Sequence, residues 1–285
     1  MTGDQDGRGA LAAREPVAFD TGVAHIARVY DYWLGGKDNF AADRKLAEQF
    51  MAADPAVIAG VRSNRAFLGR AVHFLAAEAG IRQFLDIGTG IPTSNNTHEV
   101  AQEAAPASRI VYVDNDPIVL LHARALLTSD PRGATAYVEA DARDTGLIVQ
   151  EAAATLDLSR PVALMLVGLL HCIPDDDDPR GLVAVLMDAL PAGSYLVISH
   201  PASDIHAEAM AEGATLMNRS MAGKITFRPH AEVLRLFDGL ELVEPGLVST
   251  TQWRPGPGAD TRPLPGWAGV ARKPSRTESP SPGSR

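Results

Sequence analysis

Short apolar runs alternate with amphipathic segments along residues 80–273. The apolar runs are typical of strands, and they occupy residues 82–88, 109–115, 135–141, 162–168, 194–200, 241–249 and 267–272. The first five are almost continuously apolar, as expected for a parallel sheet that helices cover on both faces. We therefore predict a buried, mostly parallel sheet.

The amphipathic segments between these runs predict helices, at residues 96–105, 117–129, 145–156, 179–190, 201–221 and 230–237. Two of them begin at Asp116-Pro117 and Asp178-Pro179, where a carboxylate can cap the helix and proline suits its first position. No helix separates the last two strands. We expect these strands to form an antiparallel pair at the sheet edge, connected by the Pro- and Gly-rich loop 254–266.

The chain ahead of the sheet predicts three more helices, at residues 22–34, 41–52 and 56–79. We interpret residues 17–79 as a helical N-terminal cap or lid and residues 80–273 as the α/β domain. Residues 1–16 and 274–285 are rich in Gly, Ser, Pro and charged residues, with little apolar surface to bury, so we predict that both ends are disordered.

Composition and charge narrow the class of protein. The chain of 285 residues is 46% hydrophobic, which suits a folded globular protein. It has 26 Lys and Arg against 35 Asp and Glu, a net charge of −9, and no basic run of the kind that binds nucleic acid. The lone Cys172 cannot form a disulfide within the chain, and neither a secretory signal nor a membrane span is evident. We expect a cytoplasmic protein that binds neither membranes nor nucleic acid.

The first strand ends in an acid and turns through two glycines, in the order Asp86, Gly88 and Gly90. Glycine lets the backbone approach a ligand closely, and open α/β sheets bind ligands at this edge. The dinucleotide fingerprint requires a small residue where this chain has Thr93. The turn therefore favours a nucleotide-like ligand without a pyrophosphate.

The next two strands also end in acids. Asp114 follows the second strand, where a carboxylate can accept hydrogen bonds from both ribose hydroxyls, and Asp141 follows the third, where it can accept from an exocyclic amine. Each acid alone could equally cap a helix or lie in solvent. The three together, beside the glycine turn, favour a binding site.

These motifs resemble those of class I S-adenosylmethionine-dependent methyltransferases. The segments that carry the resemblance are DIGTG, YVDNDP, ADARD and LLHCIPD. More narrowly, RVYDYWLGGKDNFAADR from residue 28 and FLDIGTGIPTSNNTHEVAQ from residue 84 resemble an actinomycete family of S-adenosyl methyltransferases, formerly of unknown function. The match covers nearly all of residues 20–273. It implies a Rossmann-like sheet with an antiparallel last strand and S-adenosyl-L-methionine as the cofactor.

The resemblance also implies a set of cofactor-binding residues. The residues at the methionine end would be Asp86, Gly88, Thr89 and Gly90, and Asp114 would bind the ribose. The adenine would contact Asn115, Asp141 and Ala142, and the sulfonium would lie above Val167 and Gly168. The third glycine common in the class is absent, because Ile91-Pro92-Thr93 stands there. The path of the turn after Gly90 is therefore open.

A hydroxyl or phenol acceptor needs a base, and His171 is the leading candidate because the matching position faces the methyl group in the resembling enzymes. His171 could instead be a packed histidine at a strand end, and His200 is a second candidate. The run Asp175–Asp178 could suggest a magnesium site, but it leads into a helix start, so we predict capping and no metal site.

The segment YDYWLGGKDNF contains Tyr30, Tyr32, Trp33 and Lys37 around a Gly-Gly pair. Aromatic residues at helical spacing are commonly core residues. The two glycines followed by charged residues favour a bend against a pocket instead, and a lid is needed over the carboxyl ends of the strands. We predict that residues 28–44 cover the cofactor and help to form the acceptor pocket.

These observations predict a methyltransferase that acts on a small molecule, since the acidic chain suits an anionic polymer poorly. The sequence does not identify the acceptor or the oligomeric state. Two alternatives stay open: an NAD(P)-binding oxidoreductase, and a protein that binds S-adenosylmethionine without transferring its methyl group.

Overall fold

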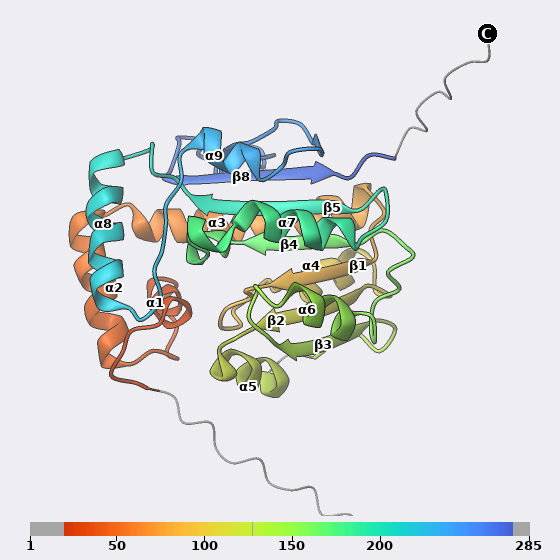
Figure 1. The fold of residues 1–285 in the computed structure, drawn as a ribbon, viewed down its shortest axis with the longest axis horizontal. Helices are drawn as coiled ribbons and strands as arrows, with labels where there is room; N and C mark the ends of the chain where they lie inside the picture. Colours follow the sequence, from red (N-terminus) through yellow and green to blue (C-terminus); the bar gives the residue numbers. More distant parts are fainter. Residues whose placement is uncertain (1–19, 127, 276–285) are drawn as a thin grey trace, which may run out of the picture.

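The fold is a mixed, eight-stranded sheet flanked by helices (Figure 1), in a computed structural model that describes residues 20–126 and 128–275. The strands are β1 (Gln83–Ile87), β2 (Arg109–Asp114), β3 (Ala134–Glu139), β4 (Ala163–Val167), β5 (Tyr195–Pro201), β6 (Glu241–Leu242), β7 (Val248–Ser249) and β8 (Gly266–Arg272). Their order is β3-β2-β1-β4-β5-β8-β6, and β7 also pairs with β8. Strands β1 to β5 are parallel and β8 is antiparallel to β5. The predicted parallel sheet with an antiparallel last strand is therefore confirmed.

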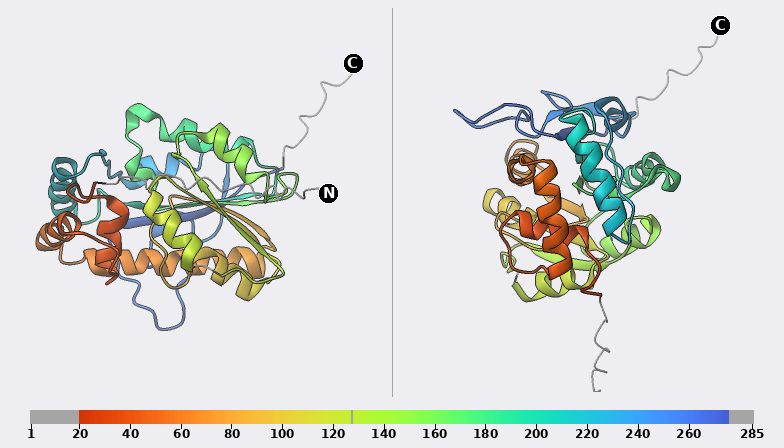
Figure 2. Two further views of the ribbon diagram at one scale, coloured as in Figure 1. Left: turned by 90° about the horizontal axis from the view of Figure 1, so that it is seen from below. Right: turned by 90° about the vertical axis from the view of Figure 1, so that its left-hand side faces the viewer.

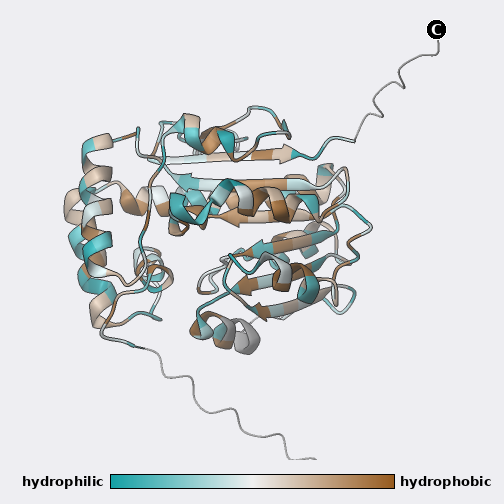
Figure 3. Ribbon diagram, in the orientation of Figure 1, coloured by the Kyte–Doolittle hydropathy of each residue, from teal (hydrophilic) through white to brown (hydrophobic). Residues whose placement is uncertain are grey.

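Helices cover both faces of the sheet, which explains why its strands are apolar throughout (Figure 2). One face packs against α6 (Thr145–Ala152), α7 (Pro179–Asp188) and α9 (His230–Arg235), and the other against α3 (Val57–His73) and α4 (Thr97–Ala104). The helix α5 (Pro117–Leu126) contacts β2 and β3. Apolar residues gather on the strands and polar residues on the outer helix faces (Figure 3).

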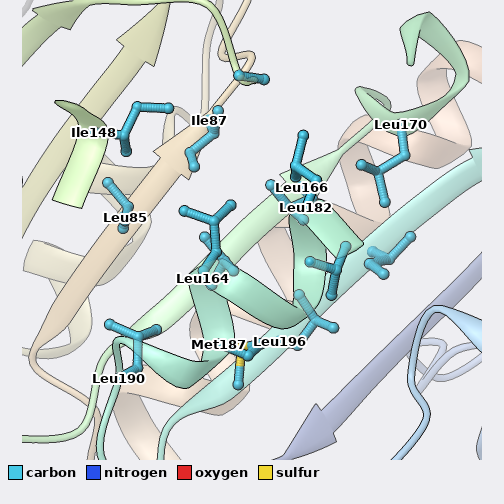
Figure 4. Close-up of a cluster of buried hydrophobic side chains, with 14 of the residues drawn as sticks. Leu85, Ile87, Ile148, Leu164, Leu166, Leu170, Leu182, Met187, Leu190 and Leu196 are labelled. Atoms are coloured by element: carbon cyan, nitrogen blue, oxygen red, sulfur yellow. The ribbon is translucent and has the colours of Figure 1, made fainter. Parts of the chain in front are cut away.

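Successive strand residues point to opposite faces and enter two separate cores. Leu85 and Leu164 join Ile148 and Leu182 in the core shown in Figure 4. Phe84 lies on the other face, in the core that includes the second half of α3. Burial on both faces holds the carboxyl ends of the strands in fixed positions.

Two predicted elements differ from the structure. The run 241–249 forms β6 and β7 instead of one strand, because Pro245 has no N–H for a ladder and Gly246 turns the chain with φ +89°. The helix predicted at 201–221 begins only at Ala207, because β5 runs on to Pro201, which pairs with Gly266. This helix is α8 (Ala207–Ser220).

A group of helices lies beyond the carboxyl ends of the parallel strands (Figure 1). It contains α1 (Ile26–Trp33), α2 (Ala41–Ala53), the start of α3 and α8, which share a third hydrophobic core. The rest of α3 packs on the sheet and continues as a π-helix, Phe74–Glu78. The division at residue 80 stays a prediction, and the predicted disorder of residues 1–16 and most of 274–285 lies outside the described residues.

None of the helices within residues 20–126 and 128–275 is long and apolar enough to cross a membrane.

Candidate functional site

The strand order reverses between β1 and β4, and a pocket of about 420 Å³ opens there. Open α/β sheets bind ligands beyond the carboxyl ends of the strands at such a reversal. The volume suits a small organic ligand. All ten residues predicted to bind a cofactor line this pocket: Asp86, Gly88, Thr89, Gly90, Asp114, Asn115, Asp141, Ala142, Val167 and Gly168.

The turn after β1 has the backbone that its glycines predict. Gly88 and Gly90 have φ values of +73° and +65°, a region that favours glycine. A Cβ added to Gly88 would also lie 2.5 Å from Cδ1 of Leu169, which follows β4. Glycine at 88 therefore lets the turns after β1 and β4 approach each other at the pocket floor.

Asp86 is a buried carboxylate at the end of β1. Its Oδ2 accepts a hydrogen bond of 2.6 Å from Thr97 Oγ1, and burial raises the pKa of Asp86 to about 6. It forms no salt bridge with any cationic side chain in the described ranges. A bound cation would lower this pKa, so the site favours a positively charged group beside Asp86.

Asp114 connects the ends of β1 and β2. Its Oδ2 accepts from the backbone N–H of Gly90 at 2.9 Å, and its Oδ1 accepts from that of Asp116 at 2.9 Å. Each carboxylate oxygen can accept two hydrogen bonds, so acceptor capacity is left for a ligand. Burial raises the pKa of Asp114. The hydrogen bond from Gly90 to Asp114 holds the turn after β1, whose path could not be predicted because Thr93 replaces the usual third glycine.

Asp141 and Asn115 complete the far side of the pocket. Asp141 accepts from the backbone N–H of Arg143 and from its guanidinium, both at distances of 2.9 Å. Asn115 is exposed. The carboxyl ends of three neighbouring strands thus bring Asp86, Asp114 and Asp141 to one site.

His171 lies on a short 3₁₀ turn after β4, Leu170–Cys172, and is buried. Burial, with a smaller effect from the cationic Arg228, lowers the pKa of His171 to about 4. The imidazole is therefore neutral near pH 7, and its buried Nδ1 has no hydrogen-bond partner within the described residues. A neutral ring with a free nitrogen can bind or orient a polar ligand group.

Arg228 fixes the turn that carries His171. Its guanidinium is buried and donates to the carbonyls of Leu170 at 2.9 Å and Ile173 at 2.8 Å. It also donates to His200 Nε2 at 3.0 Å, while His200 Nδ1 donates to the carbonyl of Pro201 at 2.9 Å. Both ring nitrogens of His200 are thus hydrogen-bonded, so of these two histidines His171 has the nitrogen free for a ligand.

The two buried histidines predict acid-sensitive stability. Burial lowers the pKa of His171 to about 4 and of His200 to about 3, from 6.5 when unfolded. As the pH falls below 6.5, only the unfolded chain takes up these protons, so each histidine removes about 1.4 kcal/mol of stability per pH unit. Asp86 opposes this below pH 6, because its raised folded pKa stabilises the protonated native state. Burial also raises the pKa values of Asp114 and Asp31, which oppose the histidines, and lowers that of His98, which acts with them. We therefore expect His171 to cost stability between pH 6 and 4 relative to a variant that lacks it.

Urea denaturation at pH 6, 5 and 4 measures this loss. His171→Gln should lower the pH slope by about the contribution of one histidine. His73→Gln, at an exposed side chain of α3, is the matched control and should leave the slope unchanged. An unchanged slope in His171→Gln would contradict the assignment.

The four predicted lid residues have different surroundings in the structure. Tyr30 lines the pocket, and its hydroxyl accepts from Asn64 Nδ2 at 3.0 Å and donates to the carbonyl of Val61 at 3.1 Å. Trp33 is buried against α2 and donates to the carbonyl of Ala47. Tyr32 hydrogen-bonds to Glu48, and Lys37 is exposed; neither lines this pocket.

The polar residues of the same segment bind one another. Asp31 accepts from the backbone N–H of Asp38 at 2.9 Å and from Asn39 Nδ2 at 2.8 Å. A Cβ on Gly36 would overlap the Asp31 carboxylate, which explains the second glycine of the pair. Arg28 forms a buried ion pair with Asp43. This network shapes the bend between α1 and α2.

The acidic run after His171 is explained by protein contacts. Asp178 accepts from the backbone N–H of Gly181 at 3.0 Å and caps α7, which confirms the predicted capping. Asp175 pairs with Arg228, and Asp177 pairs with Arg143. Across the described residues, no group of three or more His, Cys, Asp or Glu side chains is arranged to bind a metal ion.

Several pocket residues were not predicted from the sequence. Asn64 and Arg65 come from α3, Leu169 from the turn after β4, and residues 222–225 from the loop after α8. Arg65 donates to the carbonyls of Ser94 and Asn95 and so joins α3 to the loop before α4. No local motif marks these residues, because the fold brings them to the pocket from distant segments.

A smaller pocket of about 110 Å³ adjoins the first, between the N-terminal helices and the ends of β5 and β8. We call it the inner pocket. It shares Ile26, Tyr30, Asn64, Gly168 and His171 with the larger pocket. His171 and Asn64 therefore lie where the two pockets meet.

Comparisons with known proteins agree with this geometry. The sequence model of a family described as S-adenosyl methyltransferase matches residues 12–274. The chain is 47% identical to a DUF574 family protein from Streptomyces avermitilis, with a TM-score of 0.86 over 90% of this chain and 99% of that one. It is 44% identical to a candidate methyltransferase from Thermobifida fusca, with a TM-score of 0.82 over 90% and 96% of the two chains. A search of curated proteins found no match.

Proposed function

The chain belongs to the S-adenosyl methyltransferase family, and from this premise we propose that it transfers the methyl group of S-adenosylmethionine to a small molecule bound beside His171. The observation that carries the proposal is a pair of adjacent pockets that share His171. A pocket bordered by three strand-end carboxylates meets a second, smaller pocket at the neutral, unpartnered His171.

The residues of the larger pocket fit the cofactor chemically. We assign Asp86, Gly88, Thr89 and Gly90 to the methionine end, where the buried Asp86 carboxylate offsets the charge of the ammonium group. We assign Asp114 to the ribose hydroxyls, which its remaining lone pairs can accept. Asn115, Asp141 and Ala142 are assigned to the adenine, and Val167 and Gly168 to the floor beneath the sulfonium.

S-adenosylmethionine supplies a methyl group that its sulfonium already activates. The task of the chain is then to align the acceptor and to exclude water. His171 is assigned to the acceptor, whose proton its neutral imidazole can accept in a hydrogen bond. Arg228 positions this imidazole through the two carbonyls of its turn.

The N-terminal helices support the proposed lid. Tyr30 lines both pockets, and two contacts join this part of the chain to the sheet domain: His25 Nδ1 lies 3.3 Å from Asp116 Oδ2, and His122 Nδ1 lies 3.5 Å from Asp38 Oδ2. These contacts would close the site above the carboxyl ends of β1 and β2. Tyr32 and Lys37 are assigned to the support and outer surface of the lid, and Trp33 to the wall of the inner pocket.

The size of the inner pocket, about 110 Å³, supports a small-molecule acceptor. The net charge of −9 also opposes a nucleic-acid acceptor. An oxidoreductase is disfavoured by the family and by Thr93, whose backbone N–H donates to Asn96 Oδ1 in the turn where the dinucleotide fingerprint needs a small residue.

Calorimetry with S-adenosylhomocysteine and NADH tests the cofactor. We expect one site for S-adenosylhomocysteine and none for NADH. The affinity should fall by up to tenfold per pH unit below pH 6, because a proton on Asp86 competes with the ligand ammonium. Asp86→Asn should bind more weakly and lose this pH dependence. Tighter binding of NADH would overturn the proposal.

Transfer of labelled methyl groups to cell extract tests catalysis. We expect label in the low-molecular-weight fraction. Label in macromolecules alone would refute the small-molecule acceptor, and binding without any transfer would indicate a non-catalytic S-adenosylmethionine-binding protein.

A further inference from the structure

The inner pocket has mostly apolar walls. Its aromatic and aliphatic lining comes from α1, α2, α3 and α8 and from the segment before α9, and includes Trp33, Phe50, Val57, Met210, Met217 and Phe227. Its volume of about 110 Å³ is close to that of an engineered apolar cavity of about 150 Å³ that binds benzene. This pocket therefore accommodates one ring, or a chain of similar size.

Four buried polar atoms on residues that line this pocket have no partner in the described part of the chain. They are Asp54 Oδ2, Asn64 Oδ1, His171 Nδ1 and Ser199 Oγ. Buried polar atoms are almost always hydrogen-bonded, because an unmade bond costs free energy. Four such atoms around one small pocket therefore point to a ligand that completes them.

The chemistry of these atoms restricts the ligand. Asp54 Oδ2 and Asn64 Oδ1 can only accept hydrogen bonds, so the ligand must supply N–H or O–H donors. The second oxygen of Asp54 accepts from the backbone N–H of Ala56 at 3.0 Å and lies 3.9 Å from Nδ1 of the partly exposed His206. Asp54 itself is 4% exposed. A carboxylate so removed from water favours a cationic group and opposes an anionic one.

The positions of these four residues also indicate which end of the ligand lies deepest. Asp54 and Ser199 line only the inner pocket, whereas Asn64 and His171 line both pockets. A ligand bound to all four atoms would place one polar group among the N-terminal helices. It would present another group at the junction with the proposed cofactor pocket.

We propose that the inner pocket binds the methyl acceptor and that this acceptor is a small, single-ring or similarly compact amine, with its ammonium on Asp54 and a second polar group at Asn64 and His171. This inference rests on the proposed function only where it identifies the ligand of the inner pocket as the methyl acceptor. The selectivity of the pocket for an amine is independent of methyl transfer.

Four ring compounds of matched size test the selectivity: benzylamine, benzyl alcohol, toluene and benzoate. Each is titrated into the full-length protein saturated with S-adenosylhomocysteine, and into the protein alone. We expect benzylamine to bind at least about tenfold more tightly than toluene, since a hydrogen bond to a charged group adds that much affinity. Benzyl alcohol should fall between them, and benzoate should bind least. Equal affinity for benzylamine and toluene, or a preference for benzoate, would overturn the proposal.

Two variants test the polar atoms. Asp54→Asn keeps the acceptor for Ala56 but removes the charge, so the preference for benzylamine over benzyl alcohol should disappear. Ser199→Ala removes an unpartnered hydroxyl, so the protein should be at least as stable as the wild type while benzyl alcohol binds more weakly. Asp260→Asn, at a side chain 60% exposed and outside both pockets, is the control and should change neither result. An unchanged amine preference in Asp54→Asn would refute the assignment.

The two proposals fail separately. Amine-selective binding without methyl transfer to any amine would refute the acceptor role and leave the binding site. Failure of S-adenosylhomocysteine to bind would refute the proposed function, and the amine series with the protein alone would still test the pocket.

Discussion

Asp114→Ala is expected to weaken the binding of S-adenosylhomocysteine by about 100-fold or more. The carboxylate is assigned to two ribose hydroxyls, and each hydrogen bond to a charged group is worth about 1.5–3 kcal/mol. The substitution also removes the acceptor for the backbone N–H groups of Gly90 and Asp116, so the glycine turn loses the bond that positions it. Both effects lower affinity, and calorimetry measures their sum.

Asp114→Asn separates the two effects. It keeps one acceptor oxygen and the size of the side chain but loses the charge and half of the acceptor capacity, so its affinity should lie between those of Asp114→Ala and the wild type. Asp130→Ala is the matched control, since Asp130 pairs with Arg132 away from the pocket. Wild-type affinity in a folded Asp114→Ala protein would refute the ribose assignment.

Arg228→Met is expected to destabilise the fold by about 3–5 kcal/mol, the cost of breaking a buried charged network. The substitution leaves the carbonyls of Leu170 and Ile173 and the ring of His200 without their donor. For a chain of this size, about 1 kcal/mol corresponds to 2–4 °C, so the melting temperature should fall by about 6–20 °C. Differential scanning calorimetry measures this directly.

Two further substitutions serve as controls for Arg228→Met. Arg262→Met removes an ion pair whose arginine is 88% exposed, and it should change stability by less than about 0.5 kcal/mol. Arg228→Lys retains the charge but has a single nitrogen for partners on several sides, so it should recover only part of the loss. A melting temperature for Arg228→Met equal to that of the Arg262→Met control would show that the network does not support the His171 turn.

The periodicity of the chain predicted most of the fold because buried parallel strands must be apolar on both faces. Strands β1 to β5 and the helices between them lie within a few residues of their predicted bounds. The prediction failed at Pro245, where the apolar run 241–249 continues in the sequence but the ladder cannot. Hydropathy alone does not register a missing N–H donor.

The strand-end acids could be predicted for a similar reason. Parallel strands end at one edge of the sheet, so Asp86, Asp114 and Asp141 were expected to lie together, and they do line one pocket. The aromatic residues of α1 could not be assigned in this way. Tyr30 and Trp33 lie on one short helix, but only Tyr30 lines the larger pocket, because the rotation of α1 against α2 decides which side chain reaches it.

The architecture, the acidic edge and the family could be predicted because each is encoded in local pattern or in contiguous motifs. The groups that complete the site could not, because they meet only when distant segments pack together. Arg228 lies 55 residues from the carbonyl of Ile173 that it binds, and Asp54, Asn64 and Ser199 meet His171 around the inner pocket from separate helices and strands. Such contacts depend on how helices pack over the sheet, and packing between distant segments leaves no periodic signal along the chain.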